Sequence, residues 1–299
     1  MRNGLLAIAA LMALASAPTG SHEVGSRLEA LNQLCRATIE KRDYDEAQRI
    51  CKRITFDAEK MAPGSNAHLV SILNMGDIKA RVENYVDADA YYTTALQLVD
   101  RNTGPDSEEA VGILTQLIEF KVKRGKYLDA AVLAKRALAI REQSGGANDI
   151  RVAVARARYA DLLSQSHQFL DAEVVYAQAL GALEHGGAPT AETYALTAQH
   201  FGEMYERRSQ YKQAEQQYRR VVEIVQRNGL SYRLLAGAYD RLAFVCDQQD
   251  RPADAAALYR RAIATLRGTP TSPEVLARLQ AQLAALQPAP APLSVQGTR

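Results

Sequence analysis

Residues Tyr127–Leu138 read YLDAAVLAKRAL, and they contain a frame of one aromatic residue and two alanines that recurs along most of the chain. The leading positions of successive copies are 44, 85, 127, 169, 211 and 252, so the period is 41 or 42 residues. The copies are Tyr44, Ala47, Ile54; Tyr85, Ala88, Ala95; Tyr127, Ala130, Ala137; Phe169, Ala172, Ala179; Tyr211, Ala214, Val221; and Pro252, Ala255, Ala262. Because a period held this closely is typical of stacked structural units, the sequence predicts a repeat protein.

Each period divides into two helical segments. In the third repeat, apolar residues at helical spacing predict a first helix over residues 107–123 and a second over residues 127–142. Gly125 stands in the turn between them, where a left-handed conformation would end the first helix. Breaks rich in glycine, proline and asparagine close the repeats. The pattern therefore predicts an all-α chain of about six helix pairs.

The two ends of the chain differ from the repeats. Arg2, the apolar residues 5–15 and the sequence ASA at 15–17 predict a signal peptide over 1–17, with a retained membrane anchor as the alternative. Residues 18–26 are small and polar and predict a flexible lead-in to a repeat domain over 27–286. Within that domain, residues 272–286 predict one last helix that caps the repeats. Residues 287–299 are rich in proline and alanine and predict a disordered tail. We therefore expect an exported protein, periplasmic or secreted, without a stable membrane span once the leader is removed.

Charge and motifs exclude several classes of function. The formal net charge is +2, from 36 basic and 34 acidic residues, which gives no electrostatic case for a nucleic-acid partner. The five histidines are scattered, without the spacing of a metal site, and the sequence has no phosphate-binding, dinucleotide-binding or nucleophile-elbow motif. We therefore expect no metal, no cofactor and no catalysis.

The helix pairs resemble tetratricopeptide repeats (TPRs). Where that family places a small residue, nine positions before each leading residue, stand Cys35, Gly76, Ile118, Ala160, Gly202 and Ala243. Where it usually has an aromatic, seven positions after, stand Cys51, Tyr92, Ala134, Tyr176, Tyr218 and Tyr259. The usual repeat has about 34 residues, and the longer period here is similar to the kinesin-light-chain-type subclass. The resemblance implies a right-handed α-solenoid whose first helices line a concave wall that binds protein or peptide.

Two rows of polar residues fall on the first helices, on the wall that the resemblance makes concave. One row is acidic and is followed by a mostly basic residue four positions later; its pairs are Asp77 and Arg81, Glu119 and Lys123, Asp161 and Gln165, and Glu203 and Arg207. The other row consists mainly of hydrogen-bond donors: Asn74, Gln116, Arg158, His200 and Arg241. Both rows could line a groove for an extended segment. The alternative is that the acidic row only forms surface pairs along each helix.

The aromatic and cysteine residues leave further alternatives. Tyr92, Tyr176, Tyr218 and Tyr259 occupy packing positions and are expected in the core, whereas Tyr194, Tyr205, Tyr232 and Tyr239 could face the groove. The resemblance places Cys35 and Cys51 at facing positions of one helix pair, which suits either a disulfide or two buried thiols. Cys246 has no candidate partner.

These patterns favour a non-catalytic scaffold or adaptor that holds a peptide segment or partner surface on its concave face. The alternatives are a structural component that self-assembles, including as a homo-oligomer, and a regulatory subunit of a larger exported complex.

Overall fold

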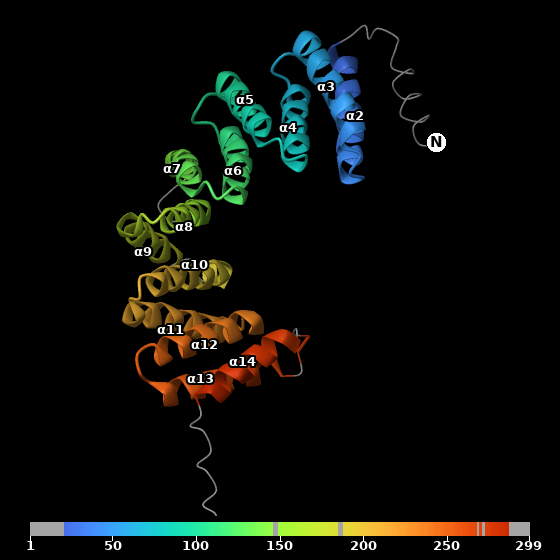
Figure 1. The fold of residues 1–299 in the computed structure, drawn as a ribbon. Helices are drawn as coiled ribbons and strands as arrows, with labels where there is room; N and C mark the ends of the chain where they lie inside the picture. The colour runs from blue at the N-terminus through green and yellow to red at the C-terminus, as the bar shows by residue number, and fades with distance from the viewer. Residues whose placement is uncertain (1–20, 146–148, 185–187, 268, 271–272, 287–299) are drawn as a thin grey trace, which may run out of the picture. The chain divides into compact units, whose positions relative to one another are not determined.

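The computed structural model describes residues 21–145, 149–184, 188–267, 269–270 and 273–286. These residues form thirteen α-helices and no strand (Figure 1), so the predicted all-α fold of helix pairs with a final capping helix is confirmed. The predicted signal peptide and tail lie outside the described residues. In chain order the helices are α2 (Ser21–Glu40), α3 (Tyr44–Met61), α4 (Asn66–Arg81), α5 (Tyr85–Thr103), α6 (Glu108–Lys123), α7 (Tyr127–Ser144), α8 (Ile150–Gln165), α9 (Phe169–Glu184), α10 (Ala188–Arg207), α11 (Tyr211–Asn228), α12 (Tyr232–Asp247), α13 (Pro252–Leu266) and α14 (Pro273–Ala285).

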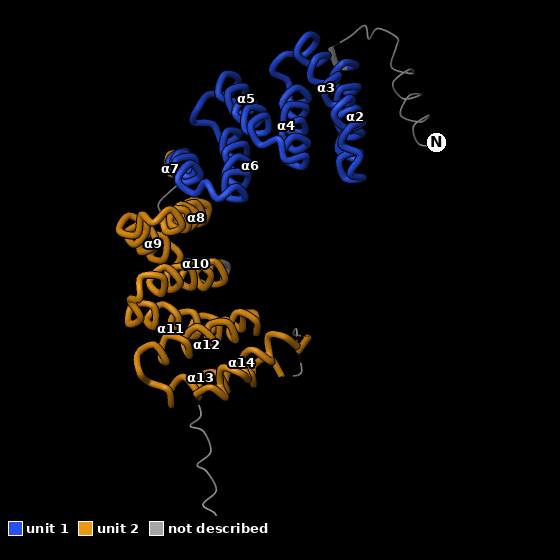
Figure 2. The backbone as a smooth tube through the Cα atoms, in the orientation of Figure 1, with its two compact units in different colours: residues 1–140 blue, residues 141–299 orange. Residues whose placement is uncertain are grey.

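The chain divides into two compact units, residues 1–140 and residues 141–299 (Figure 2). In unit 1, α2 packs on α3, α3 on α4, α4 on α5 and α5 on α6. In unit 2 the same succession runs from α8 to α14. First helices of neighbouring repeats also touch, α2 with α4 in unit 1 and α8 with α10 in unit 2. Side chains from successive first helices are therefore brought together within each unit.

The turn inside each helix pair has the same backbone conformation in all six repeats. The residue two positions before each leading residue has a positive φ, between 56° and 69°. Gly125 behaves as predicted, with φ of 69°, but it is the one glycine in this set, which otherwise comprises Arg42, Glu83, His167, Ser209 and Asp250. A side chain in the left-handed region costs roughly 1–2 kcal/mol. Packing of the two helices therefore determines the backbone conformation of this turn, even where the local sequence does not favour a positive φ.

Polar caps fix where most first helices begin. The side chains of Ser65, Ser107, Asp149 and Ser231 each accept a hydrogen bond from a backbone N–H in the first turn of the following helix. Each cap satisfies one of the donors that a helix start leaves without an intrahelical partner. The caps hold the first helices in equivalent register from one repeat to the next.

Burial of apolar side chains stabilises the helices at both ends of the repeat region. Helix α2 begins at Ser21, so the prediction of a flexible lead-in is wrong for residues 21–26. Val24 and Leu28 are buried in a cluster with α3 and α4, and this burial extends the helix towards the N-terminus. At the other end, Leu279 of α14 is buried against α12 and α13, with Leu276 packed beside it. Helix α14 thus covers an apolar surface that the last pair would otherwise expose.

Close helix packing depends on small residues that face large ones. A Cβ atom built on Gly202 of α10 would lie 2.6 Å from Cε1 of Tyr218 on α11, and the Tyr218 side chain is completely buried. Gly76 of α4 faces Tyr92 of α5 in the same way, with a Cβ distance of 3.0 Å. In these two repeats the glycine nine positions before the leading residue is therefore a packing requirement, whereas the third repeat departs from the pattern with Ile118 at that position.

Replacing Gly202 with valine is expected to lower the free energy of unfolding by about 1–3 kcal/mol, because Tyr218 has no room to move. Gly181 of α9 is the matched control, since no atom lies within 4 Å of a Cβ at that position. Gly181→Val should change stability by less than about 0.5 kcal/mol, because helix propensity changes little. Urea unfolding followed by circular dichroism compares the two variants. Equal losses at both positions would contradict the packing argument.

Candidate partner-binding surface

The first helices of unit 1 border a cavity of about 580 Å³. All six residues predicted for the groove in this unit line it: Asn74, Asp77, Arg81, Gln116, Glu119 and Lys123. The sequence did not indicate Arg36 of α2 or Phe120 of α6, which also line it. The rest of the wall is Val70, Leu73, Ala80 and Tyr92. Residues from three first helices therefore share one surface.

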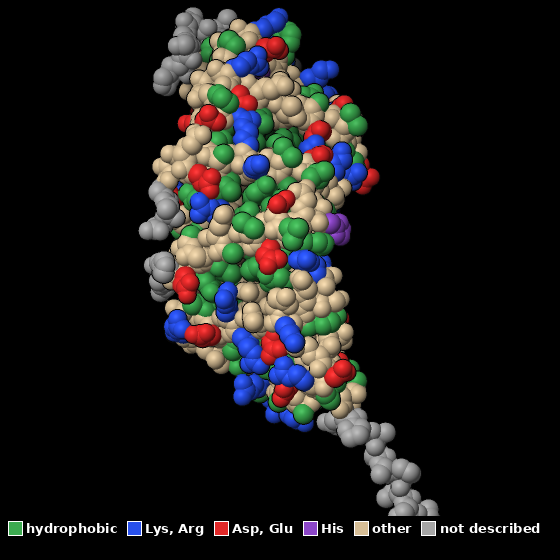
Figure 3. Space-filling model, turned by 90° about the vertical axis from the view of Figure 1, so that its left-hand side faces the viewer, with side chains coloured by type: hydrophobic (Ala, Val, Ile, Leu, Met, Phe, Trp, Pro, Cys, Tyr) green, Lys and Arg blue, Asp and Glu red, His purple; other side chains and the backbone are tan. Residues whose placement is uncertain are grey.

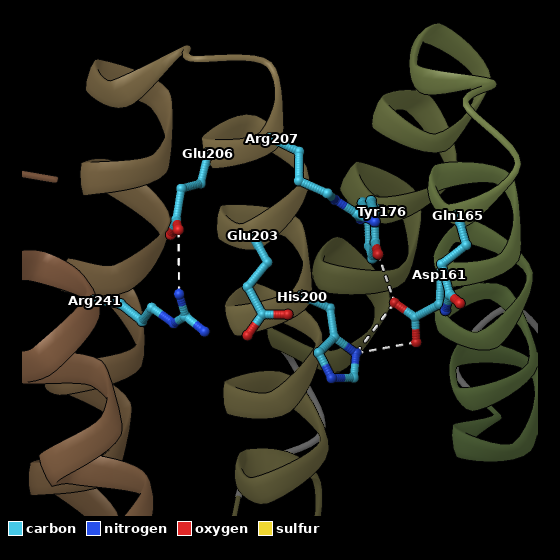
Figure 4. A pocket seen from close by; sticks show the side chains of 8 residues that line it. All are labelled: Asp161, Gln165, Tyr176, His200, Glu203, Glu206, Arg207 and Arg241. Atoms are coloured by element: carbon cyan, nitrogen blue, oxygen red, sulfur yellow. Dashed lines mark hydrogen bonds and ion pairs between the residues drawn. The ribbon is translucent and has the colours of Figure 1, made fainter. Parts of the chain in front are cut away.

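Unit 2 has a corresponding cavity of about 370 Å³ (Figure 4). Six of the seven residues that the two rows place in this unit line it: Asp161, Gln165, His200, Glu203, Arg207 and Arg241. Tyr176 and Glu206 complete the wall. Arg158, the seventh, is half-buried on α8 and is not among the lining residues.

The two aspartates of the acidic row are bonded to tyrosines of the second helices. The hydroxyl of Tyr92 donates to Oδ1 of Asp77, and the hydroxyl of Tyr176 donates to Oδ1 of Asp161, both at 2.5 Å. Burial, together with the neighbouring carboxylate, raises the pKa of both tyrosines. The surface pair expected between Asp77 and Arg81 is thus replaced by a bond between the two helices of the repeat. In both cases the tyrosine stands 15 residues after the aspartate, a spacing that could have indicated the pairing.

The donor row joins neighbouring repeats. Nδ1 of His200 on α10 lies 3.0 Å from Oδ2 of Asp161 on α8. Nη1 of Arg241 on α12 lies 3.2 Å from Oε1 of Glu206 on α10. In unit 1, the amide of Asn74 donates to Asn32 of α2, and Asn74 is only 2% exposed. The donors were predicted to contact a ligand backbone, but these three already bind the preceding repeat, so Asn74 in particular is largely structural.

The hydrogen bond to Asp161 raises the pKa of His200 above its ordinary value. Asp161 on α8, Tyr176 on α9, and Glu203 and Arg207 on α10 are the titratable and charged groups around this ring. Because the folded pKa exceeds the unfolded value of about 6.5, the pair contributes its full stability below pH 6.5. That contribution is lost as the pH rises through the folded pKa.

Substituting His200 with glutamine is therefore expected to destabilise the protein more at about pH 5.5 than at about pH 9. The difference should stay below about 1 kcal/mol, because an exposed ion pair is screened by water; the His200 side chain is 44% exposed. Urea unfolding of both proteins at each pH provides the measurement. A loss of stability that is the same at the two pH values would contradict the assignment.

The tyrosines divide between the core and the surface. Tyr92, Tyr176, Tyr218 and Tyr259 are all buried, as predicted. Tyr205 and Tyr239, which could have faced the groove, are 6% and 5% exposed and belong to the core as well. Tyr194 lies against α11 in a smaller cavity, and Tyr232 packs against the α12–α13 cluster. The groove therefore has no aromatic surface built from these four residues.

Cys35 of α2 and Cys51 of α3 are joined by a disulfide, with Cα atoms 5.8 Å apart. Both residues are completely buried. Of the two alternatives that the sequence left open, this geometry matches the disulfide. Cys246 is a buried free thiol on α12.

Comparisons with known proteins agree with this architecture. Residues 194–268 match the family model of the tetratricopeptide repeat. No curated protein sequence matches the chain. Among the solved structures with a similar fold is BtubC (BKLC) from P. vanneervenii, with 21% identity over 88% of this chain and 94% of that chain and a TM-score of 0.54. A putative kinesin light chain of Podosopora anserina with nearly identical TPR-like repeats is 13% identical, and the match covers 69% of this chain and 98% of that chain with a TM-score of 0.56. PilW, a type IV pilus biogenesis factor, is 17% identical, and the match covers 84% of this chain and 98% of that chain with a TM-score of 0.51.

The chain is thus a helical-repeat protein with the tetratricopeptide-like fold, similar to kinesin-light-chain-type repeats. Folds of this class typically mediate contacts between proteins and are generally not catalytic. Among the described helices, none combines the length and the apolar character needed to cross a bilayer.

Proposed function

We propose that this protein is a non-catalytic scaffold that binds a peptide segment or a partner surface on the face formed by its first helices. The observation that carries the proposal is the gathering of predicted positions, six around the cavity of unit 1 and six around that of unit 2. The lining combines apolar surface with polar side chains, several of which are already held by hydrogen bonds, as expected of a surface that must hold a backbone and its side chains.

The same proposal includes export. Arg2, the apolar residues 5–15 and the sequence ASA at 15–17 have the pattern of a cleaved leader. The test is the N-terminal sequence of the protein recovered from its host. A mature chain that starts at Pro18 supports export, and a chain that retains residues 1–17 contradicts it.

The alternative of self-assembly has an observation in its favour on the second helices. Val86 of α5, Leu128 of α7 and Leu170 of α9 follow the leading residue of their repeats directly and are 82%, 56% and 74% exposed. Exposed apolar side chains at equivalent positions suit contact with another molecule. Figure 3 shows one face of the molecule, where hydrophobic side chains lie interspersed with charged ones of both signs. This mixed surface does not form one continuous apolar patch, so we rank assembly second.

Site-specific photo-cross-linking in the host separates the two functions. A photoreactive residue at Gln116 or Gln165 probes the two cavities, and the same residue at Val86 or Leu170 probes the second helices. The scaffold predicts one foreign partner cross-linked at the cavity positions and not at the other two. Cross-links only to further copies of this chain, at Val86 and Leu170, would favour assembly instead.

A further inference from the structure

We propose that the cavity of unit 2 takes a positively charged side chain, an arginine or a lysine, of the bound segment, with Glu203 as its counter-charge. This inference rests on the proposed function, because it names the chemistry of the segment that the scaffold would hold.

Two of the three carboxylates in this cavity are already occupied (Figure 4). Asp161 accepts from Tyr176 and pairs with His200. Glu206 accepts from Tyr218 at 2.8 Å and pairs with Arg241 at 3.2 Å. Each of these carboxylates is held by one hydroxyl and one basic group, so neither is available to a ligand without breaking a bond.

Glu203 is differently placed. It lies between the two occupied carboxylates, and the partner that the structure gives it is the neutral amide of Gln199, with Nε2 3.0 Å from Oε1. The basic residue one turn further along α10, Arg207, was predicted to pair with it. Arg207 instead donates from Nη2 to Oγ of Ser164 on α8, at 2.5 Å. Glu203 thus has a negative charge with room for a cation.

The pairing of the charges in the cavity favours a cation beside Glu203. His200, when protonated, pairs with Asp161, and Arg241 pairs with Glu206, while Arg207 donates to the hydroxyl of Ser164. A half-buried carboxylate loses hydration that a charged hydrogen bond can replace, and arginine can offer two parallel donors to it. The volume of about 370 Å³ lies within the range of roughly 300–1,000 Å³ found for ligand sites, which is ample for one long side chain.

The test uses three blocked heptapeptides of serine and alanine whose central residue is arginine, citrulline or glutamate. Citrulline keeps the shape of arginine and removes its charge. Titration of the ¹⁵N-labelled full chain is followed by the backbone amide shifts of residues 199–207. We expect saturable shifts with the arginine peptide and binding weaker by at least about tenfold for citrulline, because a charged hydrogen bond is lost.

Two isosteric variants assign the effect to one carboxylate. Glu203→Gln should weaken binding of the arginine peptide by at least about tenfold. Glu223→Gln is the matched control, because Glu223 lies on α11, is 66% exposed and pairs with Arg227 away from the cavity. It should leave the affinity unchanged.

Several results would overturn the inference: no saturable shift with the arginine peptide, equal binding of the citrulline peptide, tighter binding of the glutamate peptide, or equal losses in the two variants. If one of these occurs while cross-links to a partner persist at Gln116 and Gln165, the scaffold function stands and only the basic side chain is wrong. If those cross-links are also missing, the proposed function fails with it.

Discussion

Replacing Tyr176 with alanine is expected to lower the free energy of unfolding of unit 2 by about 3–5 kcal/mol, the range found for large aromatic truncations. The Tyr176 side chain is 1% exposed and stacks on Phe201 of α10, with ring centroids 4.8 Å apart. Its hydroxyl also donates to Asp161 of α8. One ring therefore joins three helices, and its removal leaves both a cavity and a carboxylate without its donor.

Tyr176→Phe is the matched control, because it removes the hydroxyl and keeps the ring. It should cost about 1 kcal/mol, the net value of one hydrogen bond. Urea unfolding followed by circular dichroism gives the totals, and hydrogen exchange in α8, α9 and α10 localises the loss, since repeat proteins can open in parts. An alanine variant within about 1 kcal/mol of the wild type would contradict the central place of this ring.

Removing the disulfide between Cys35 and Cys51 is expected to destabilise the first helix pair by about 3 kcal/mol, the value for a closed loop of about 15 residues. The two cysteines are 16 residues apart in sequence. The bond restricts the unfolded chain within α2 and α3, the first helix pair that the structure describes. The double variant Cys35→Ala, Cys51→Ala should therefore unfold at lower urea than the oxidised wild type, beginning in α2 and α3.

Cys246→Ala is the control for the loss of a buried sulfur, and it should leave the helix pair α2–α3 unaffected. Thiol alkylation of the denatured but unreduced protein, read by mass spectrometry, counts the free cysteines. One labelled cysteine is expected, and three would show that the bond does not form. If the double variant unfolds at the same urea concentration as the oxidised wild type, the disulfide has no role in stability and the prediction is wrong.

The helix pairs could be predicted from the sequence because the signal is local and repeated. Ala130 and Ala137 follow Tyr127 at spacings that place them on one face of a helix, and both alanines are buried. The same period located the turn at Gly125. Five further turns take the same conformation without glycine, since packing across the pair outweighs local preference there.

The positions of the groove residues could be predicted, but not their partners. The spacing of Asp77 and Arg81 describes one helix, whereas the hydroxyl of Tyr92 arrives from another. Asn74 had a polar side chain suited to a groove, yet it is buried against Asn32 of the preceding repeat. Contacts between helices depend on how the helices cross, and a pattern within one helix carries no information on that.

This arrangement limits which substitutions can test binding. Asp77 and Asp161 line the cavities but also hold buried tyrosines, so a change there would combine lost binding with lost stability. Glu203 lines the cavity of unit 2 and is bonded to the amide of Gln199 rather than to a tyrosine of the core. It is therefore the better position for altering the surface alone.

Binding of a partner on the first-helix face can be tested by capture from a native extract. The bait proteins are the wild type, the groove variant Glu119→Lys, Glu203→Lys and the control Glu59→Lys, Glu223→Lys, whose two glutamates are exposed on second helices. Circular dichroism first establishes that all three remain helical, and mass spectrometry then quantifies what each retains. We predict that wild type and control retain the same partner and that the groove variant retains at least about tenfold less, as expected when two charges in a binding surface are reversed. Equal retention by all three proteins, or recovery of nothing but further copies of this chain, would contradict the account.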